Sequence, residues 1–345
     1  HHSNISTGNI IPYFIQHTER FYVFIYPRLR DNQPAQFYEY NNSVKTRSLS
    51  LWIYKGKKKW LLFLLSYFYF YYWLIVFSIR NTKVIVSLPI FLAGSSVLNI
   101  LTRNTYVFWV FDHNPATSNL ERAYNTFLSW HARHTKHTIY LSPALARIYH
   151  GTENQVASFG IKPVARILNP VTGHIGYIGD LREFQGLDLL CDIVLKNKEL
   201  HLDIIGNGVY YEKIAKYIKK HQLQDRITLF GYTNYALLPE ITKNWEAGLA
   251  LYETGGASFA QYTEPGKIKL YAELGIPVIM TDVSYIADIV KKYKTGELVA
   301  YSEKAVLPAL ETIRTNYKSY TTGIARMRAD FEYTNHYKKT FTFLE

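Results

Sequence analysis

Glu264–Thr281 reads EPGKIKLYAELGIPVIMT, and this stretch indicates more about the fold and chemistry of the chain than any other. A Pro-Gly turn opens an expected amphipathic helix, Gly275 is placed to end it, and Pro277 precedes an apolar run typical of a buried strand. Backbone N–H groups at such a helix start can hold an anion, and Lys267 adds a positive charge in the first turn. The stretch predicts a helix-to-strand unit of an α/β domain with an anion site. The alternative is an ordinary unit of this kind in which Lys267 is solvated.

Composition sets limits on the class of protein. The chain has 345 residues, of which 48% are hydrophobic and 19% charged, so it is long enough for two domains with well-formed cores. Its single cysteine, Cys191, leaves no CxxC spacing, which excludes a disulfide framework and a cysteine-based metal site.

The charge is distributed unevenly along the chain. Residues 1–170 carry 18 Lys and Arg against 6 Asp and Glu, whereas residues 171–345 carry 21 against 21. The whole excess of +12 therefore belongs to the first half. An excess of one sign indicates an anionic partner there: a membrane leaflet, a nucleic acid or an acidic glycan.

The second half alternates between apolar runs of strand length and segments with helical periodicity. This alternation predicts a parallel, doubly wound sheet, in which ligands bind at the carboxyl ends of the strands. The expected strands are 174–178, 200–205, 227–230, 247–252, 278–281 and 297–300, and the expected helices are 184–198, 209–220, 237–243, 285–291 and the one that opens at the Pro-Gly turn.

The first half is compatible with a second α/β domain. Its strand-like runs are 21–26, 84–88, 105–111 and 137–141, and an amphipathic stretch covers 120–133. Residues 169–173, with Pro and Gly, form a plausible linker. We therefore expect an N-terminal domain over 1–170, a C-terminal domain over 171–330, and a terminal helix over 331–345 that packs back on the N-terminal domain.

A basic run comes directly before twenty uncharged residues, 60–79. That length meets the usual threshold for a transmembrane helix, but four tyrosines lie mid-segment, where a bilayer core offers their hydroxyls no partners. A helix over about 57–80 that lies in the membrane interface fits both observations, because aromatic side chains enter the headgroup region while lysines attract anionic lipid. A buried domain helix and a true span remain open. The residues expected at the membrane or acceptor are Lys55, Lys57, Lys58, Lys59 and Trp60.

Four elements of the second half stand in a characteristic order: GDLREFQGLDLL (179–190), LDIIGNG (202–208), ITLFG (227–231) and the stretch 265–279. A lone Gly-x-Gly would indicate little, but the four together resemble the nucleotide-binding domain of family-4 glycosyltransferases. The resemblance implies an α/β chain of the GT-B fold, with two Rossmann-like doubly wound parallel-sheet domains facing a cleft.

The resemblance also places a donor site in the second half. Where the family carries basic residues for the donor diphosphate, this chain has Asp180 and Gln185, and Arg182 is the nearby cation. Where the family has two glutamates eight residues apart, this chain has Tyr262 and Leu270. The expected donor-binding residues are Gly179, Arg182, Gln185, Gly206, Gly208, Tyr262, Glu264, Pro265, Lys267 and Tyr271, with Lys267 the most important.

In the first half, the strand 107–111 is followed by Asp112 and His113. This resembles the histidine-bearing loop that faces the donor sugar in these transferases. The resemblance implies that His113 hydrogen-bonds the sugar and that Asp112 accepts the acceptor hydroxyl proton as a general base. The alternative is a helix cap at Asp112 or Asn114 with a paired histidine.

Together these features predict a hexosyltransferase-like enzyme that moves a sugar from a nucleoside-diphosphate donor to a lipid-linked or membrane-proximal glycan. The resemblance implies retention of the anomeric configuration; inversion is open if Asp112 is the base. No metal or other cofactor is expected, since the chain has no Asp-x-Asp pair. The expected partners are a nucleotide sugar, a lipid-linked glycan or glycolipid and an anionic membrane surface, with no nucleic acid, at the cytoplasmic face of the cell membrane as a peripheral protein. The competing hypotheses are a catalytically silent GT-B subunit that binds glycan or a partner transferase, and an integral membrane protein.

Overall fold

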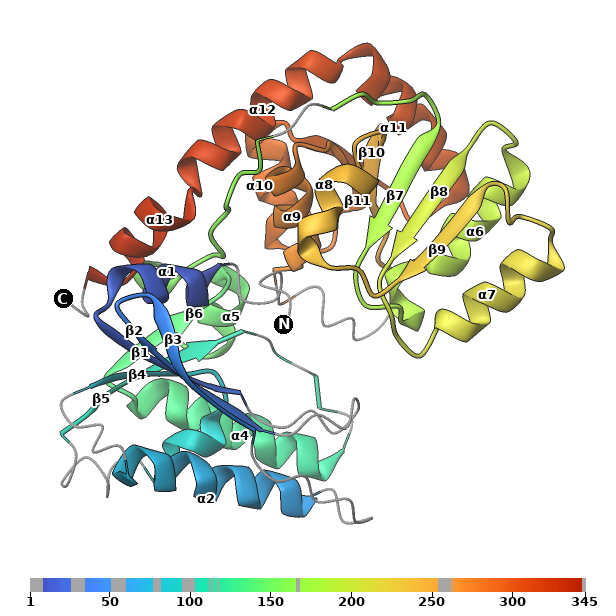
Figure 1. Ribbon diagram of the computed structural model, residues 1–345. Coiled ribbons are helices and arrows are strands. Elements are labelled where there is room, and N and C mark those ends of the chain that lie inside the picture. The colour runs from blue at the N-terminus through green and yellow to red at the C-terminus, as the bar shows by residue number, and fades with distance from the viewer. Residues whose placement is uncertain are drawn as a thin grey trace. The chain divides into compact units, whose positions relative to one another are not determined.

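A computed structural model describes residues 9–25, 35–50, 60–76, 82–94, 103–111, 113, 115–116, 118–165, 168–253, 262 and 264–342. The chain divides into two compact units (Figure 1). The C-terminal unit comprises Ser158–Thr340 together with Asn9, and the N-terminal unit comprises Ile10–Ala157 together with the chain from Phe341 onward. The boundary between the two units therefore lies after residue 157, whereas we expected it after residue 170.

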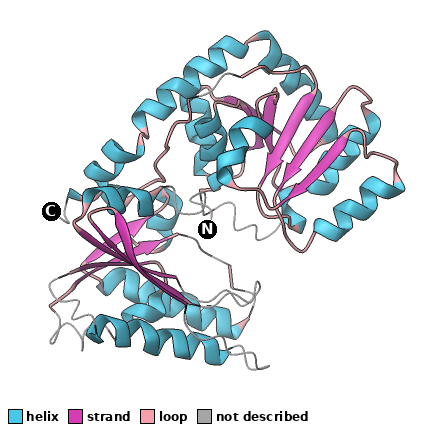
Figure 2. Ribbon diagram, in the orientation of Figure 1, coloured by secondary structure: helices cyan, strands magenta, loops and turns pink. Residues whose placement is uncertain are grey.

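The C-terminal unit is built on a six-stranded sheet in which every neighbouring pair is parallel (Figure 2). The strand order is β12-β11-β10-β7-β8-β9, so the chain leaves β7 in one direction and returns to add β10, β11 and β12 on the other side. The boundary between β7 and β10 is therefore the topological switch point, where ligands bind in open α/β sheets. The strands are β7 (His174–Ile178), β8 (His201–Ile205), β9 (Ile227–Gly231), β10 (Ala247–Ala250), β11 (Val278–Thr281) and β12 (Gly296–Val299).

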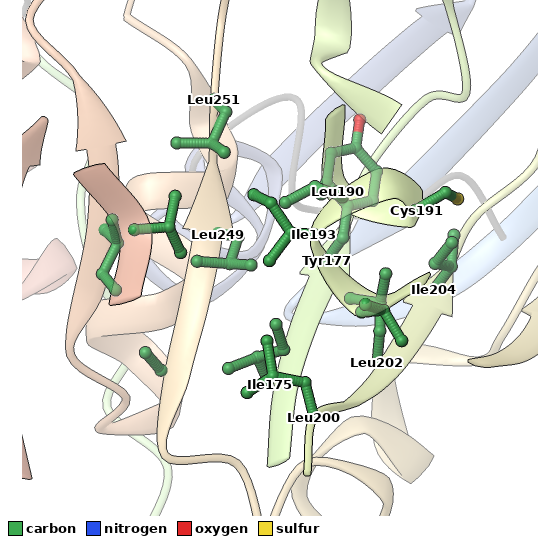
Figure 3. Close-up of a cluster of buried hydrophobic side chains, with 14 of the residues drawn as sticks. Ile175, Tyr177, Leu190, Cys191, Ile193, Leu200, Leu202, Ile204, Leu249 and Leu251 are labelled. Atoms are coloured by element: carbon green, nitrogen blue, oxygen red, sulfur yellow. The ribbon is translucent and has the colours of Figure 1, made fainter. Parts of the chain in front are cut away.

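Helices cover both faces of this sheet and bury two apolar clusters. Ile175 and Tyr177 of β7 point to the first cluster with α6, α7 and α11, whereas Ile178 points to the second with α9, α10 and α12. Figure 3 shows Tyr177, Leu190 and Ile193 gathered in the first cluster. The helices are α6 (Leu187–Lys196), α7 (Tyr211–Lys220), α8 (Leu238–Ile241), α9 (Gly266–Leu274), α10 (Tyr285–Tyr293), α11 (Glu303–Thr315), α12 (Tyr317–Asp330) and α13 (Tyr333–Thr340), with the short 3-10 helices η4 (Glu183–Gln185) and η5 (Tyr235–Leu237).

The hydroxyl of Tyr271, on α9, joins the two strands of the switch point. Direct pairing of β7 with β10 joins Ile175 to Ala247 and Gly176 to Gly248 and stops there. Further along, the Tyr271 hydroxyl accepts from Ile178 N at 3.0 Å and donates to Leu249 O at 2.9 Å. Its ring fits because Gly248 has no side chain, since a Cβ there would lie 2.7 Å from the ring. A helix side chain thus replaces the missing rung of the ladder.

The N-terminal unit contains two small sheets. β4 (Lys83–Val86), β5 (Thr105–Val110) and β6 (His137–Tyr140) form a parallel sheet, as expected for a second α/β domain. A separate antiparallel sheet, β1-β2-β3, takes up the predicted strand at 21–26 and adds two strands that the sequence did not reveal. The remaining elements are β1 (Arg20–Ile25), β2 (Gln36–Asn41), β3 (Val44–Ser50), α1 (Ile10–His17), α2 (Trp60–Val76), α4 (Asn119–His134), α5 (Pro143–Ile148), η2 (Pro89–Leu92) and η3 (Glu153–Gln155).

The aromatic segment forms α2, which carries no charged residue. One side of it packs within the N-terminal unit: the Tyr71 hydroxyl donates to Phe91 O at 2.6 Å and accepts from Gly94 N at 3.1 Å. Phe68, Tyr72 and Ile75 are exposed on another side. Among the helices that the structure describes, none is long and apolar enough to cross a membrane. Lys55, Lys57, Lys58, Lys59 and the side chain of Trp60 lie outside the described residues.

The end of the chain contributes to both units. In the C-terminal unit, the Tyr337 hydroxyl of α13 accepts a hydrogen bond from Gly160 N at 2.9 Å. In the N-terminal unit, the ring of Phe341 lies 5.1 Å from that of Phe14 and 5.5 Å from that of Trp109.

Replacing Tyr271 by Phe should lower the free energy of unfolding by about 1–3 kcal/mol, because the Ile178 amide and the Leu249 carbonyl lose a buried partner while the ring still fills its space. Urea denaturation measures the change. Tyr72→Phe, which removes an exposed hydroxyl from α2, is the matched control and should change stability by less than about 0.5 kcal/mol. Equal stability of the Tyr271→Phe and wild-type proteins would contradict the bridging role.

Candidate functional site

Two loops meet at the carboxyl ends of β7 and β8. Gly179 N donates to Ile205 O at 3.0 Å, and Leu181 N donates to Asn207 O at 3.0 Å. A Cβ on Gly206 would lie 1.8 Å from Gly179 O, and one on Gly208 would lie 2.3 Å from Leu181 O. Gly206 and Gly208 are therefore required for the two loops to pack closely, whatever else binds there.

Lys267 brings its ammonium to this pair of loops from the first turn of α9. Its side chain is only 8% exposed, and Nζ donates to Gln185 Oε1 at 2.6 Å. Nζ also lies 4.0 Å from the centre of the Tyr177 ring, and a Cβ on Gly179 would lie 3.1 Å from it. The predicted residues Gly179, Gln185 and Lys267 thus lie together at the switch point.

Burial lowers the pKa of Lys267 to about 7, against a weaker opposing effect of the Asp180 carboxylate. Among the described residues, no carboxylate lies within ion-pair distance of Nζ. Near neutral pH the amine therefore exists in both charge states, and an anion beside it would favour the protonated form.

Gln185 stands where the family has a basic residue, and it accepts a hydrogen bond from Lys267. Its side chain is buried, and Oε1 lies 3.2 Å from the Tyr177 hydroxyl as well as 2.6 Å from Nζ. The Tyr177 hydroxyl also donates to Asp180 O at 2.9 Å. The amide oxygen therefore positions the one buried cation at this edge of the described structure rather than supplying a second charge.

Arg182 is paired with a neighbour in its own loop. Its guanidinium makes an ion pair with the Asp180 carboxylate, and both side chains are largely exposed. Asp180 thus offsets the positive charge that the sequence assigned to this loop.

The backbone N–H groups at the start of α9 are a second candidate for holding an anion. Pro265 occupies the N-cap position, and its side chain makes no capping hydrogen bond. Backbone N–H groups at such a helix end are unsatisfied within the helix and carry the positive end of its dipole. The Lys267 ammonium, from the same turn, lies beside Gly179.

α9 itself is not amphipathic, contrary to our prediction, because every residue from Lys267 to Leu274 is buried. The sheet covers one side of α9, and residues near Ser158 and Phe331 cover another side. Lys267 is therefore not a solvated first-turn lysine.

Glu264 and Lys269 form a second buried group that sequence reasoning missed. Lys269 Nζ lies 3.4 Å from Glu264 Oε1, and it donates to Ser158 Oγ at 2.9 Å and to Phe159 O at 2.6 Å. The Ser158 hydroxyl in turn donates to Glu264 Oε2. Glu264 was expected to bind the donor, but its carboxylate is 2% exposed and engaged by these two neighbours.

Two groups from the end of the chain complete this buried network. Lys269 Nζ lies 3.4 Å from the centre of the Phe331 ring. His336 Nε2 lies 2.6 Å from Ser158 O, and burial, reinforced by the Lys269 ammonium, lowers the pKa of His336 to about 4. Burial also lowers the pKa of Lys269, to about 8, against the opposing effect of the Glu264 carboxylate.

In the N-terminal unit, His113 follows β5 as expected. Its Nδ1 lies 2.7 Å from the Tyr149 hydroxyl, and Tyr149 is itself buried. Asp112, the expected base, lies outside the described residues. The roles of His113 and Asp112 stay predictions.

Sequence comparison gives the class of the C-terminal unit. Residues 172–322 match the family model described as glycosyl transferases group 1. The C-terminal unit therefore contains a glycosyltransferase group 1 domain. No curated protein matches it in sequence.

Solved glycosyltransferase structures share the fold over most of the chain. A TarM variant from S. aureus matches over 94% of this chain and 74% of its own, with 15% identity and a TM-score of 0.61. Sucrose-phosphate synthase from Thermosynechococcus elongatus matches over 85% and 80%, with 15% identity and a TM-score of 0.65. The lipopolysaccharide outer core galactosyltransferase WaaB matches over 84% and 82%, with 17% identity and a TM-score of 0.56. This glycosyltransferase therefore has the GT-B fold.

The remaining predicted site residues of this glycosyltransferase have different surroundings. Tyr271 is fully buried, and its hydroxyl is engaged in the strand bridge. Tyr262 is half-buried, and its role in donor binding stays a prediction. Among the described residues, no three His, Cys, Asp or Glu side chains are grouped so that they could hold a metal ion.

Lys269→Met should lower the free energy of unfolding by about 3–5 kcal/mol, because it leaves the Glu264 carboxylate buried without its cation. The double variant Lys269→Met/Glu264→Gln should recover most of that loss, since neither charge remains. Urea denaturation of the set measures both. Lys291→Met, which breaks the exposed pair with Asp282, is the control and should cost less than about 1 kcal/mol. A double variant no more stable than Lys269→Met would argue against a charge effect.

Proposed function

We propose that this glycosyltransferase takes a sugar from a nucleoside-diphosphate donor held at the switch point of the C-terminal unit. The observation that carries the proposal is the buried ammonium of Lys267 between Gln185, the Tyr177 ring and Gly179. A buried cation with no ion-pair partner among the described residues is stabilised by an incoming anion. The donor diphosphate is the anion that a nucleotide-sugar transferase must bind.

In this mechanism the sugar leaves the diphosphate, and negative charge develops on the phosphate oxygens. Lys267 and the N–H groups at the start of α9 stabilise that charge, which they do more strongly than water because the site is buried and preorganised. Lys267 is positively charged in the complex, because the bound anion favours the protonated form of its amine. Arg182 contributes less, since Asp180 neutralises it. We propose that this charge stabilisation needs no metal ion.

The acceptor and the stereochemistry are further parts of the proposal. We propose a lipid-linked or membrane-proximal glycan as the acceptor, with retention of the anomeric configuration and with His113 as a hydrogen-bond donor to the sugar. The positive charge of residues 1–170 and the exposed apolar side of α2 support a membrane-proximal acceptor. The similarity to WaaB, described as a lipopolysaccharide transferase, and to TarM, solved with UDP and α-GlcNAc-glycerol, is in keeping with it. We propose that the protein works as a peripheral protein at the cytoplasmic face of the membrane.

Nucleotide sugars should raise the thermal unfolding temperature, because a ligand that binds only the folded state stabilises it. A screen of UDP, GDP, TDP and CMP sugars identifies the base. For the diphosphate of that base, Lys267→Met should weaken binding by about tenfold to a hundredfold, the usual worth of a hydrogen-bonded charge. Lys291→Met, an exposed lysine outside the site, should leave the affinity unchanged.

Diphosphate binding by the wild-type protein should also take up a proton. The pKa of Lys267 is about 7 in the free protein, and the bound anion raises it, so affinity should fall as pH rises above about 7. Calorimetry at pH 7.5 in buffers of different ionisation enthalpy measures this uptake, which Lys267→Met should abolish. Absence of any nucleotide binding would instead favour a catalytically silent GT-B subunit, consistent with Gln185 and Leu270 at positions where the family has charged residues.

Replacing Lys55, Lys57, Lys58 and Lys59 together by Gln should weaken binding to anionic vesicles at least tenfold, since each lysine near such a surface contributes about 1 kcal/mol. Co-sedimentation with vesicles of phosphatidylcholine and phosphatidylglycerol measures the change. Unaltered binding at physiological salt would contradict a role for these lysines at the membrane.

A further inference from the structure

Tyr149, in the N-terminal unit, is a buried tyrosine whose hydroxyl lies against the predicted site residue His113. The hydroxyl oxygen lies 2.7 Å from His113 Nδ1, and the two rings meet edge to face with their centres 5.6 Å apart. Tyr149 is 2% exposed, whereas His113 is half-buried. One nitrogen of the imidazole is therefore engaged inside the unit by a phenol.

The fold brings these two residues together because they follow neighbouring strands of the β4–β5–β6 sheet (Figure 1). His113 comes three residues after the end of β5, and the last residue of that strand, Val110, pairs with Tyr140 at the end of β6. α5 begins at Pro143, three residues after β6, and Tyr149 is its C-cap. Both residues therefore belong to segments that follow the carboxyl ends of adjacent parallel strands, where ligands bind in α/β sheets.

The surroundings of Tyr149 fix the position of its ring. The residue ends α5, and the next residue, His150, has the left-handed φ of 59° that turns the chain away from the helix. The ring lies parallel to that of Tyr140, with centres 6.4 Å apart and planes 7° apart. Gly151 makes room for Tyr140, because a Cβ there would lie 2.1 Å from the Tyr140 ring. A hydroxyl on a ring held in this way can orient a neighbouring side chain.

The direction of this hydrogen bond follows from the chemistry of the two groups. A neutral imidazole carries its proton on one ring nitrogen only, so the bond made by one nitrogen decides what the other can do. A phenol is weakly acidic, with a pKa of about 10 in water, and the proton-free nitrogen is the basic atom of the ring, so the phenol is the better donor. With the Tyr149 hydroxyl as donor and Nδ1 as acceptor, the proton of His113 lies on Nε2. The opposite tautomer would leave Nε2 able only to accept.

We propose that Tyr149 is a positioning residue that holds His113 as the Nε2–H tautomer, so that Nε2–H donates a hydrogen bond to a hydroxyl oxygen of the transferred sugar. The proton stays on Nε2, and His113 therefore binds the sugar without acting as an acid or a base. The inference rests on the proposed function, which gives His113 this contact, and it adds the residue that sets which ring nitrogen makes it. A histidine oriented by a hydrogen bond at its second nitrogen loses less freedom on binding, so its contact contributes more to affinity.

Nitrogen-15 NMR of the full chain labelled at histidine reads the tautomer of His113. At about pH 8, well above the ordinary histidine pKa of about 6.5, Nδ1 should give the resonance of a proton-free nitrogen that accepts a hydrogen bond, and Nε2 that of a protonated nitrogen. The chain has 12 histidines, and the signals that His113→Gln removes are those of His113. Tyr149→Phe should shift the Nδ1 resonance toward that of a ring nitrogen without a hydrogen bond. A proton on Nδ1 in the wild-type protein, or an Nδ1 resonance that Tyr149→Phe leaves unchanged, would overturn the proposal.

Ligand affinity separates this role from a purely structural one. The probes are the nucleotide sugar that the thermal screen selects and the nucleoside diphosphate of the same base. Tyr149→Phe should weaken binding of the nucleotide sugar about threefold to tenfold, the usual worth of one hydrogen bond, and leave the affinity for the diphosphate unchanged. Tyr71→Phe, which removes a buried hydrogen bond to Phe91 O in the same unit, is the matched control and should leave both affinities unchanged. An equal loss of both affinities in Tyr149→Phe would show a structural role, and an unaltered affinity of this folded variant for the nucleotide sugar would show no role.

The two experiments also distinguish this inference from the proposed function. A protein that binds no nucleotide while Tyr149 holds His113 as the Nε2–H tautomer would refute the proposed function and keep the tautomer assignment. Diphosphate binding that depends on Lys267, together with a proton on His113 Nδ1, would refute this inference alone.

Discussion

The contact between the Lys267 ammonium and the Gln185 amide oxygen governs the arrangement of the C-terminal unit at its ligand edge. It joins the start of α9 to the loop after β7, two segments that stand 82 residues apart in the sequence. The glycines at 179, 206 and 208 let the neighbouring backbone approach that contact, and Tyr271 on the same helix spans the strands beneath it. An ammonium enclosed in this way has lost much of its hydration, and this is the observation on which the proposed anion site rests.

The distribution of charged side chains at this site differs from the one that the family resemblance implies. Where the family distributes positive charge over the first loop, this chain has an ion pair, Asp180 with Arg182, and a neutral amide, Gln185. The positive charge is concentrated on one lysine and one helix end. In such a site few cations are present, but the attraction of each for an anion is stronger. The reason is that the interaction between charges grows as the local dielectric falls.

Sequence reasoning located the C-terminal sheet well and the environment of α9 poorly. Strands 174–178 and 278–281 were predicted at their observed limits, because short apolar runs next to Gly or Pro admit few other structures. The sequence placed Lys267 at an anion site but did not show that Lys267 and Lys269 are buried, since periodicity records hydrophobicity and not the distant partners that make a buried lysine tolerable. Those partners, Gln185 for one and Ser158 with Glu264 for the other, come from other parts of the chain. β2 and β3 were missed because polar residues occupy most of β3, so no alternation marks it.

The network around Lys269 has an evolutionary consequence. One buried amine contacts the segment at Ser158 and Phe159, the carboxylate of Glu264 and the ring of Phe331, and His336 closes on the same segment. One buried amine therefore joins the two ends of the C-terminal unit, the segment near Ser158 and the segment of Phe331 and His336. Recombination between relatives that exchanged only the region 172–322 would separate Lys269 from the residues that make its burial tolerable.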